Sequence, residues 1–169
     1  MSDTSQTNDL VIGTHGRSIF KVNMASAQQL TPLALDEPLV IFDLAKTKFS
    51  KNWGRKQPWQ KLKEPSLPVV FYASHAGAAT WTVKTKDGLL LNNGRLDCVK
   101  GLNKFTFALD LLDDVVPKYQ KSLSAADLKH KKTPLLQKAD SGKYYLQKGT
   151  FVLAIEKEGK MLTKEFVLD

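Results

Sequence analysis

Apolar and polar side chains alternate along much of the second half of the chain, which is the pattern of β-strands with one buried face. Between residues 79 and 86, Trp81 and Val83 fall on one face, while threonines and lysines fall on the other. The same alternation puts Phe105 and Phe107 on a common face. Each of these strands is therefore expected to bury one face in a core and to leave the other in water.

Short apolar runs between turn residues predict the remaining strands. These runs span residues 39–42, 69–72, 151–155 and 161–168. Gly88 and Gly159, each after an acidic residue, are expected to turn the chain in two hairpins, and Asn93 with Gly94 is expected to mark another turn. About six strands with short turns and no crossover helices predict an all-β fold, an Ig-like or fibronectin-like antiparallel β-sandwich.

An N-terminal β-hairpin is predicted by two apolar runs, residues 10–13 and 19–22, on either side of Gly16. A hairpin of two strands is only marginally stable alone, so this one needs a neighbour. The polar residues 1–9 are expected to form a disordered lead-in. The chain then divides into a hairpin and connector over residues 10–66 and a sandwich over residues 67–169.

Two segments interrupt the strand pattern with helical signals. Ser124, with Asp127 three residues later, has the spacing of a capping box and predicts a short inserted helix over residues 124–131. Residues 24–35 favour a short helix or an irregular connection that ends near Pro32.

The net charge of +8 adds a question about partners. Residues 45–63 carry seven basic residues and no acidic one, and residues 118–138 carry six lysines against one aspartate. Both segments are expected to be loops, where lysine is easily solvated, so a solvated surface is favoured over a dedicated polyanion site. Binding of nucleic acid through these Lys-rich loops stays open, but it is the least favoured reading because no strand face interleaves basic and aromatic residues.

Few residues suggest reaction chemistry. Cys98 is the single cysteine, so no internal disulfide can form, and no Cys/His metal spacing occurs. Asp113 and Asp114 are adjacent, and on a strand they would point to opposite faces rather than act together. His15 lies near Arg17 and could bind an anion, but a turn that satisfies its own backbone is favoured. No catalytic residue, metal or cofactor is predicted.

The run from residue 8 to residue 20, NDLVIGTHGRSIF, resembles the closing strand of bacterial-neuraminidase-repeat, sortilin-type β-propeller proteins. Residues 29–31, QLT, and residues 53–54, WG, are similar to segments that follow it in that family. Residues 87–88, 101–103 and 142–144 are similar to a C-terminal Ig-like sandwich of the kind found in flagellar hook-capping proteins. The resemblance covers most of this chain but only the last fifth or less of such a protein.

The resemblance implies a non-catalytic accessory β-sandwich whose partner is the β-propeller domain of a parent protein, or another protein. It also implies a secreted or periplasmic location if the chain is part of a larger exported protein, and a cytoplasmic one if Met1 is the native start. No run of 18 apolar residues is present, so no membrane span is expected.

Four residues form the predicted ligand site: Trp53, Arg55, Trp59 and Tyr72. Aromatic planes beside a basic residue can stack on sugar rings while polar neighbours bind hydroxyl groups, which is the chemistry of a carbohydrate-binding module. Because neuraminidase-type propellers often act on glycans, the resemblance makes glycan a candidate partner. The competing hypothesis is that both tryptophans are buried and pin the connector onto the sandwich.

Overall fold

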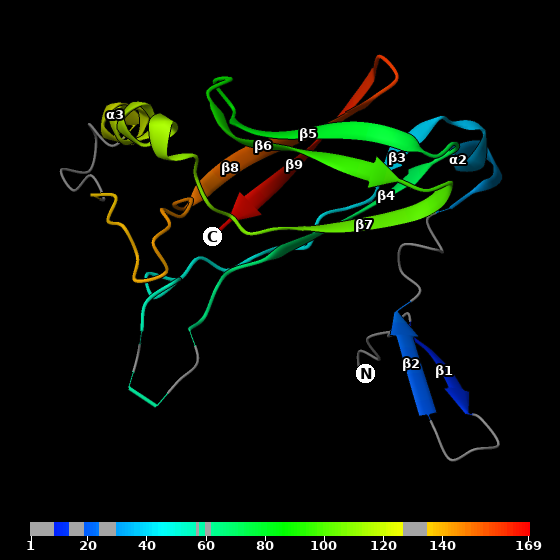
Figure 1. Ribbon diagram of the computed structural model, residues 1–169, viewed down its shortest axis with the longest axis horizontal. Helices are drawn as coiled ribbons and strands as arrows, with labels where there is room; N and C mark the ends of the chain where they lie inside the picture. Colours follow the sequence, from blue (N-terminus) through cyan, green and yellow to red (C-terminus); the bar gives the residue numbers. More distant parts are fainter. Residues whose placement is uncertain (1–8, 14–18, 24–29, 57, 60–61, 127–134) are drawn as a thin grey trace, which may run out of the picture.

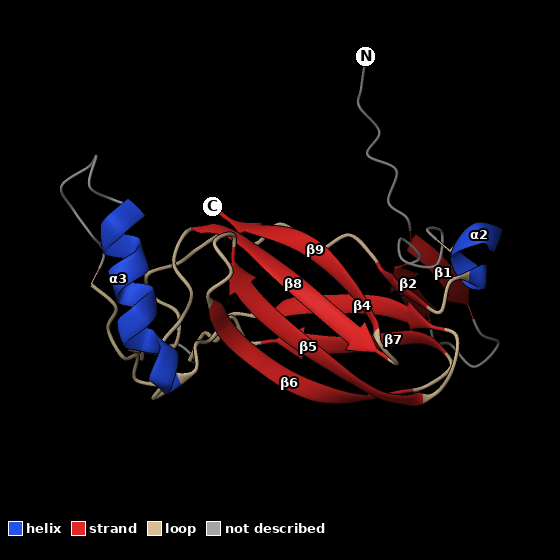
Figure 2. Ribbon diagram, turned by 90° about the horizontal axis from the view of Figure 1, so that it is seen from above, coloured by secondary structure: helices blue, strands red, loops and turns tan. Residues whose placement is uncertain are grey.

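A computed structural model of the chain describes residues 9–13, 19–23, 30–56, 58–59, 62–126 and 135–169. It confirms the predicted all-β fold, because two antiparallel sheets pack face to face (Figures 1 and 2). Predictions for residues 1–8, for the turn with His15, and for residues 127–131 of the inserted helix lie outside the described residues.

The two sheets contain seven strands. The first has the order β3-β4-β7, formed by Leu39–Ile41, Leu67–Ala73 and Gly101–Phe107. The second has the order β6-β5-β8-β9, formed by Leu90–Cys98, Gly77–Thr85, Gly149–Lys157 and Lys160–Leu168. Lettered A to G along the chain, the sheets are A-B-E and D-C-F-G, so the fourth strand lies in the sheet opposite to its place in constant-type Ig domains. Strand β3 belongs to the sandwich although it falls in the segment predicted as connector.

The core fills the space between the two sheets. Phe71 and Phe107 of the first sheet and Leu153 of the second are almost fully buried. Trp81 of β5 reaches across the core, and its ring centroid lies 5.5 Å from that of Phe105 and 5.3 Å from that of Phe107. Contacts between aromatic rings add to the gain from burying their area. The alternation read from the sequence thus assigned these faces correctly.

The turn predicted at Asn93 and Gly94 is wrong, because β6 runs without a break from Leu90 to Cys98. Gly94 is paired with Trp81 of the neighbouring strand. A Cβ atom at Gly94 would lie 2.6 Å from Nε1 of Trp81. Glycine is therefore needed here to make room for the indole. Besides marking turns, glycine occurs in strands where another group approaches the backbone closely.

The other two hairpins form where they were expected. Strands β5 and β6 join through the turn at Gly88, whose N–H donates to the carbonyl of Thr85 at 3.0 Å. Strands β8 and β9 join at Gly159, and their register places Phe151 opposite Phe166. Those two rings stack with centroids 5.4 Å apart, so cross-strand packing supports the register.

The inserted helix exists, but its predicted start is wrong. Helix α3 spans Val116–Ala126 and follows a 3₁₀ turn, η1, at Asp113–Val115, so Ser124 lies inside the helix instead of capping it. Val115 and Tyr119, four residues apart, are both buried. Packing of this apolar pair against the core sets the position of the helix more strongly than the capping signal does.

Helix α2, Pro32–Asp36, begins near Pro32, where the sequence predicted an end. The hydroxyl of Thr31 accepts the N–H of Ala34 at 3.2 Å and so caps the helix. Proline at the first helical position loses no hydrogen bond and has a suitable φ angle, which explains the start at this point.

The predicted N-terminal hairpin is confirmed by strands β1, Asp9–Gly13, and β2, Ile19–Asn23, which pair antiparallel. Among the described strands they pair only with each other, and Figure 1 shows the hairpin beside the sandwich rather than in it. The side chains of Leu10, Val11 and Ile12 are 45%, 60% and 46% exposed. Both faces of β1 are therefore uncovered.

Candidate ligand-binding pocket

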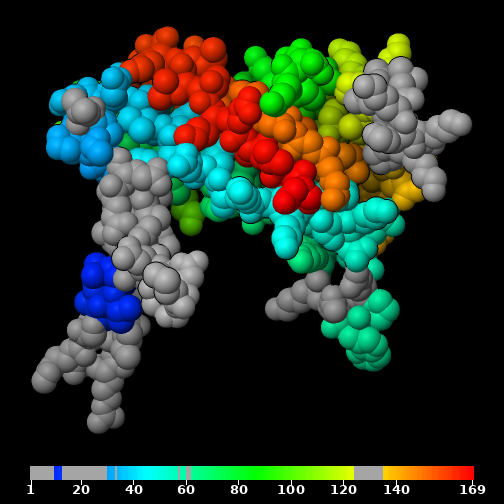
Figure 3. Space-filling view, turned by 180° about the vertical axis from the view of Figure 1, so that it is seen from behind, coloured from blue at the N-terminus to red at the C-terminus, as the bar shows by residue number. Residues whose placement is uncertain are grey.

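A pocket of about 300 Å³ lies where the connector between β3 and β4 meets the loop between α3 and β8. This volume is at the lower end of the range for small-molecule sites. Figure 3 shows the connector, in cyan, lying against the C-terminal strand and the loop before β8. The connector lines the pocket with Phe49, Ser50, Lys51, Trp53 and Arg55, and the loop lines it with Leu135, Gln137, Ala139, Tyr145 and Gln147.

Backbone pairing with the end of β9 fixes the connector in place. Thr47 forms a parallel bridge with Leu168, and the N–H of Phe49 donates to the carbonyl of Asp169 at 2.9 Å. The chain then turns, with the N–H of Trp53 donating to the carbonyl of Ser50 at 3.3 Å. This turn directs the indole of Trp53 toward the core.

Trp53 is an aromatic anchor and only 5% exposed. Its ring meets Phe49 edge to face with centroids 5.2 Å apart, and it meets Tyr145 in the same way at 6.3 Å. The hypothesis that tryptophan pins the connector therefore holds for Trp53. It does not hold for Trp59, which is fully exposed.

Gly54 lets the connector approach the loop closely. Its φ angle of +65° is in the left-handed region, and a Cβ atom there would come 2.5 Å from Cε2 of Tyr145. The N–H of Gly54 donates to the carbonyl of Lys63, and its own carbonyl accepts the N–H of Ser141, both at 2.9 Å. A side chain at this position would push the two pocket walls apart.

Polar contacts join the rim of the pocket. Arg55 Nη2 donates to Oε1 of Gln137 at 2.7 Å, and the N–H of Lys56 donates to Oδ2 of Asp140, also at 2.7 Å. Arginine has five N–H donors, so the bond to Gln137 leaves donors of Arg55 for a ligand.

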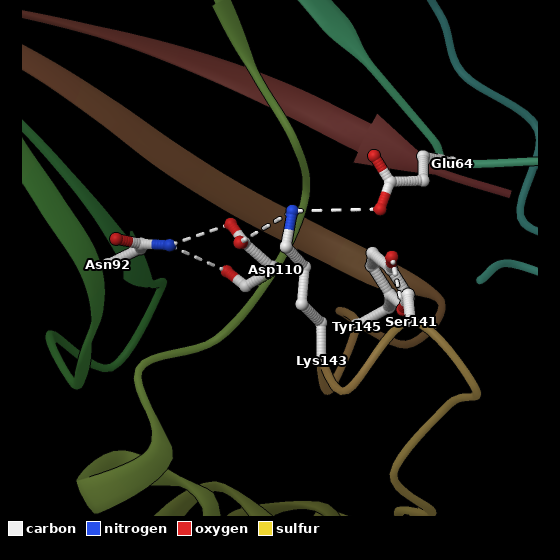
Figure 4. Close-up of polar contacts among 6 residues, drawn as sticks. All are labelled: Glu64, Asn92, Asp110, Ser141, Lys143 and Tyr145. Carbon is white, nitrogen blue, oxygen red and sulfur yellow. Dashed lines mark hydrogen bonds and ion pairs between the residues drawn. The ribbon is translucent and has the colours of Figure 1, made fainter.

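A polar network, buried at Asn92 and partly exposed at its other members, links the loop to the sandwich (Figure 4). Lys143 Nζ lies 3.7 Å from a carboxylate oxygen of Glu64 and 3.9 Å from one of Asp110. Asn92 donates to the carbonyl of Asp110 at 3.0 Å and to its carboxylate at 2.9 Å. These contacts join β6, the connector and the loop, so they hold the pocket wall to the sandwich.

The charge of the lining is one-sided. Lys51 and Arg55 are its two cations, and none of the lining residues is acidic. The fold also brings together the two basic stretches of the sequence, since residues 45–63 form one wall and the end of residues 118–138 reaches the other. A cleft lined by one sign of charge concentrates oppositely charged ligands.

The structure brings together two of the four predicted site residues. Trp53 and Arg55 both line the pocket, whereas Trp59 lies outside the lining set. Tyr72 lies on β4, is 8% exposed, and donates its hydroxyl to the carbonyl of Leu35 at 3.4 Å. Tyr72 is therefore a core residue that helps to hold helix α2.

Sequence reasoning missed Lys51, Gln137 and Tyr145 as members of the pocket. Lys51 lies in the basic stretch, which was assigned to solvated surface. Gln137 meets Arg55 across 82 residues of sequence, and no local pattern reveals such a contact.

Two buried titratable residues outside the pocket, Cys98 and Lys157, have surroundings typical of structural residues. Cys98 is buried, and burial raises the pKa of its thiol, which makes it a poor nucleophile at neutral pH. Lys157 is 5% exposed and forms an ion pair with Glu158. Among the described residues, no group of three His, Cys, Asp or Glu side chains is placed to hold a metal ion. Within the same residues, no helix is long and apolar enough to cross a membrane.

Comparison with known proteins identifies no family. No family model and no curated protein matches the chain. Among solved structures, β-D-glucoside glucohydrolase from Trichoderma reesei has a TM-score of 0.32 and 13% identity, covering 78% of this chain and 19% of that one. A β-glucosidase from Erythrobacter marinus has a TM-score of 0.27 and 10% identity, covering 63% and 13%. This chain thus spans less than a fifth of either protein, and likeness at this level indicates neither shared family nor shared activity.

Proposed function

We propose that the chain is a non-catalytic accessory β-sandwich that docks onto a partner protein through its N-terminal hairpin. The favoured partner is a β-propeller domain, in whose last blade β1 and β2 would take the place of the closing strands. The same proposal includes that the chain belongs to a larger protein that is exported from the cytoplasm.

The exposed hairpin is the observation that carries this proposal. Successive side chains of a strand point to opposite faces, so Leu10 and Ile12 share one face of β1 and Val11 lies on the other. All three are exposed, and the described core cluster contains no residue before Leu39. A two-stranded ribbon with apolar residues on both faces gains stability when another protein covers it. A blade of a propeller, with sheets on either side, would provide such cover.

The test is binding in trans to a neuraminidase-repeat propeller that lacks the hairpin closing its last blade, measured by titration calorimetry. The wild-type chain should bind, and the double variant Leu10→Ser, Ile12→Ser should lose most of the affinity because its apolar face is removed. The unfolding free energy of the sandwich should change by less than about 0.5 kcal/mol, since these side chains are exposed.

Met161→Ser is the matched control, because Met161 is 59% exposed on β9 of the sandwich. It should bind as the wild type does. Absence of binding by the wild-type chain, or equal loss in the control, would contradict docking through the hairpin.

Glycan binding is the second candidate function, and the pocket beside Trp53 favours it. The walls combine aromatic edges with hydroxyl, amide and guanidinium groups, a mixture suited to a polar ring. The fully exposed Trp59 lies four residues beyond Arg55 and offers a further ring at the surface. This role is compatible with an accessory domain, because the hairpin and the pocket use different parts of the chain.

A further inference from the structure

We infer that the pocket between the connector and the loop before β8 selects an acidic sugar, a uronic acid unit of a glycan, whose carboxylate is held by Arg55 and Lys51. This inference rests on the second candidate function and adds to it a ligand charge and the residues that recognise it.

Charge is the first argument for an acidic ligand. The guanidinium of Arg55 and the ammonium of Lys51 both line the pocket, and the lining contains no carboxylate to neutralise them. Asp140 is engaged elsewhere, because its Oδ2 accepts the N–H of Lys56. A carboxylate ligand would gain charge-assisted hydrogen bonds, which are about twice as strong as neutral ones.

Preorganisation of the cation is the second argument. Arg55 Nη2 is held by Oε1 of Gln137 at 2.7 Å, and that amide belongs to the opposite wall. The bond restricts the guanidinium while leaving its other N–H donors open to a ligand. A side chain ordered before binding loses less conformational entropy when the ligand arrives.

The neutral groups of the pocket favour a sugar ring over a nucleobase. Trp53 and Tyr145 are 5% and 6% exposed, so neither presents an open face on which a base could stack. Ser50, Gln137 and Gln147 instead supply hydroxyl and amide groups. Such groups match the hydroxyls of a sugar, whereas base recognition by single-strand binders relies on aromatic platforms.

The experiment is titration calorimetry of the whole chain with a trimer of galacturonic acid and with the neutral galactose trimer of the same linkage. The acidic trimer should bind at least about tenfold more tightly, the factor expected for loss of one charge-assisted hydrogen bond. Its affinity should fall as salt is added. The indole N–H resonance of Trp53 should shift on binding, which locates the ligand.

Arg55→Ala and Lys51→Ala should each weaken binding of the acidic trimer and leave the weak binding of the neutral trimer unchanged. Both residues are exposed, so the variants are expected to fold. Lys100→Ala is the matched control, since Lys100 is an exposed lysine in the turn between β6 and β7, at the end of the sandwich away from α3 (Figure 1). It should bind as the wild type does.

The possible outcomes distinguish failure of glycan binding from failure of selection for an acidic sugar. Equal binding of both trimers would overturn selection of an acidic ligand but support glycan binding. Binding of neither trimer would overturn both. Tighter binding of a single-stranded oligonucleotide, or equal loss of affinity in Lys100→Ala, would show a general attraction to polyanions and would overturn the assigned site.

Discussion

At the scale of single residues, Gly94 shows how a neighbour across a sheet sets the identity of a side chain. The sequence pair Asn93 and Gly94 is a common turn signal. In the structure Gly94 instead lies under the indole of Trp81, with no space for a Cβ atom. A local signal was misread because its cause lies on another strand.

Gly94→Ala should therefore lower the free energy of unfolding by about 1–3 kcal/mol, the usual cost of overpacking. The added methyl group would displace Trp81 from Phe105 and Phe107. Urea denaturation provides the measurement, and Asn93→Ala, at an exposed neighbouring position, should change stability by less than about 0.5 kcal/mol. Similar effects of the two substitutions would refute the proposed steric role of the indole.

Tyr119 provides a prediction about pH. Burial raises the pKa of its hydroxyl from 10.0 to about 12, although a hydrogen bond from the N–H of Gln147 opposes the shift. The raised pKa means that the native state keeps the proton longer than the unfolded state. The protonated Tyr119 hydroxyl therefore contributes stability that is complete below pH 10 and disappears as the pH rises through about 12.

Tyr119→Phe should therefore make the unfolding free energy less sensitive to pH in this window. A spectrophotometric titration of the folded wild-type protein should show a late-ionising tyrosine that the variant lacks. If the late ionisation remains in Tyr119→Phe, the assignment is wrong.

At the scale of elements, the strands could be predicted because their signal is local. Alternation from residue 79 to residue 86 already contains the information on which face is buried. Helix α3 was misplaced because Ser124 and Asp127 matched a local rule, while burial of Val115 and Tyr119 depends on a core formed by distant strands. For the same reason, Trp53 and Arg55 were the two predicted site residues that line one pocket, since they share one turn, whereas Gln137 and Tyr145 reach the pocket only through the fold.

At the scale of the whole molecule, the three tryptophans report on three different environments. Trp53 anchors the connector, Trp81 fills the core between the sheets, and Trp59 is fully exposed. Acrylamide should therefore quench mainly Trp59, and Trp59→Phe should leave protected, blue-shifted emission. Trp53→Ala should cost about 3 kcal/mol or more in unfolding free energy, because it removes a buried ring. Equal quenching in the wild type and Trp59→Phe would argue against this arrangement.

The pocket is built by two connections, not by the strands of the sandwich. Loops tolerate substitution and insertion better than the elements that they join. Changes at Lys51, Arg55 or Gln137 can therefore alter what the pocket recognises while the sheets keep their packing. The architecture separates the part of the chain that natural selection must preserve for folding from the part that it is free to diversify.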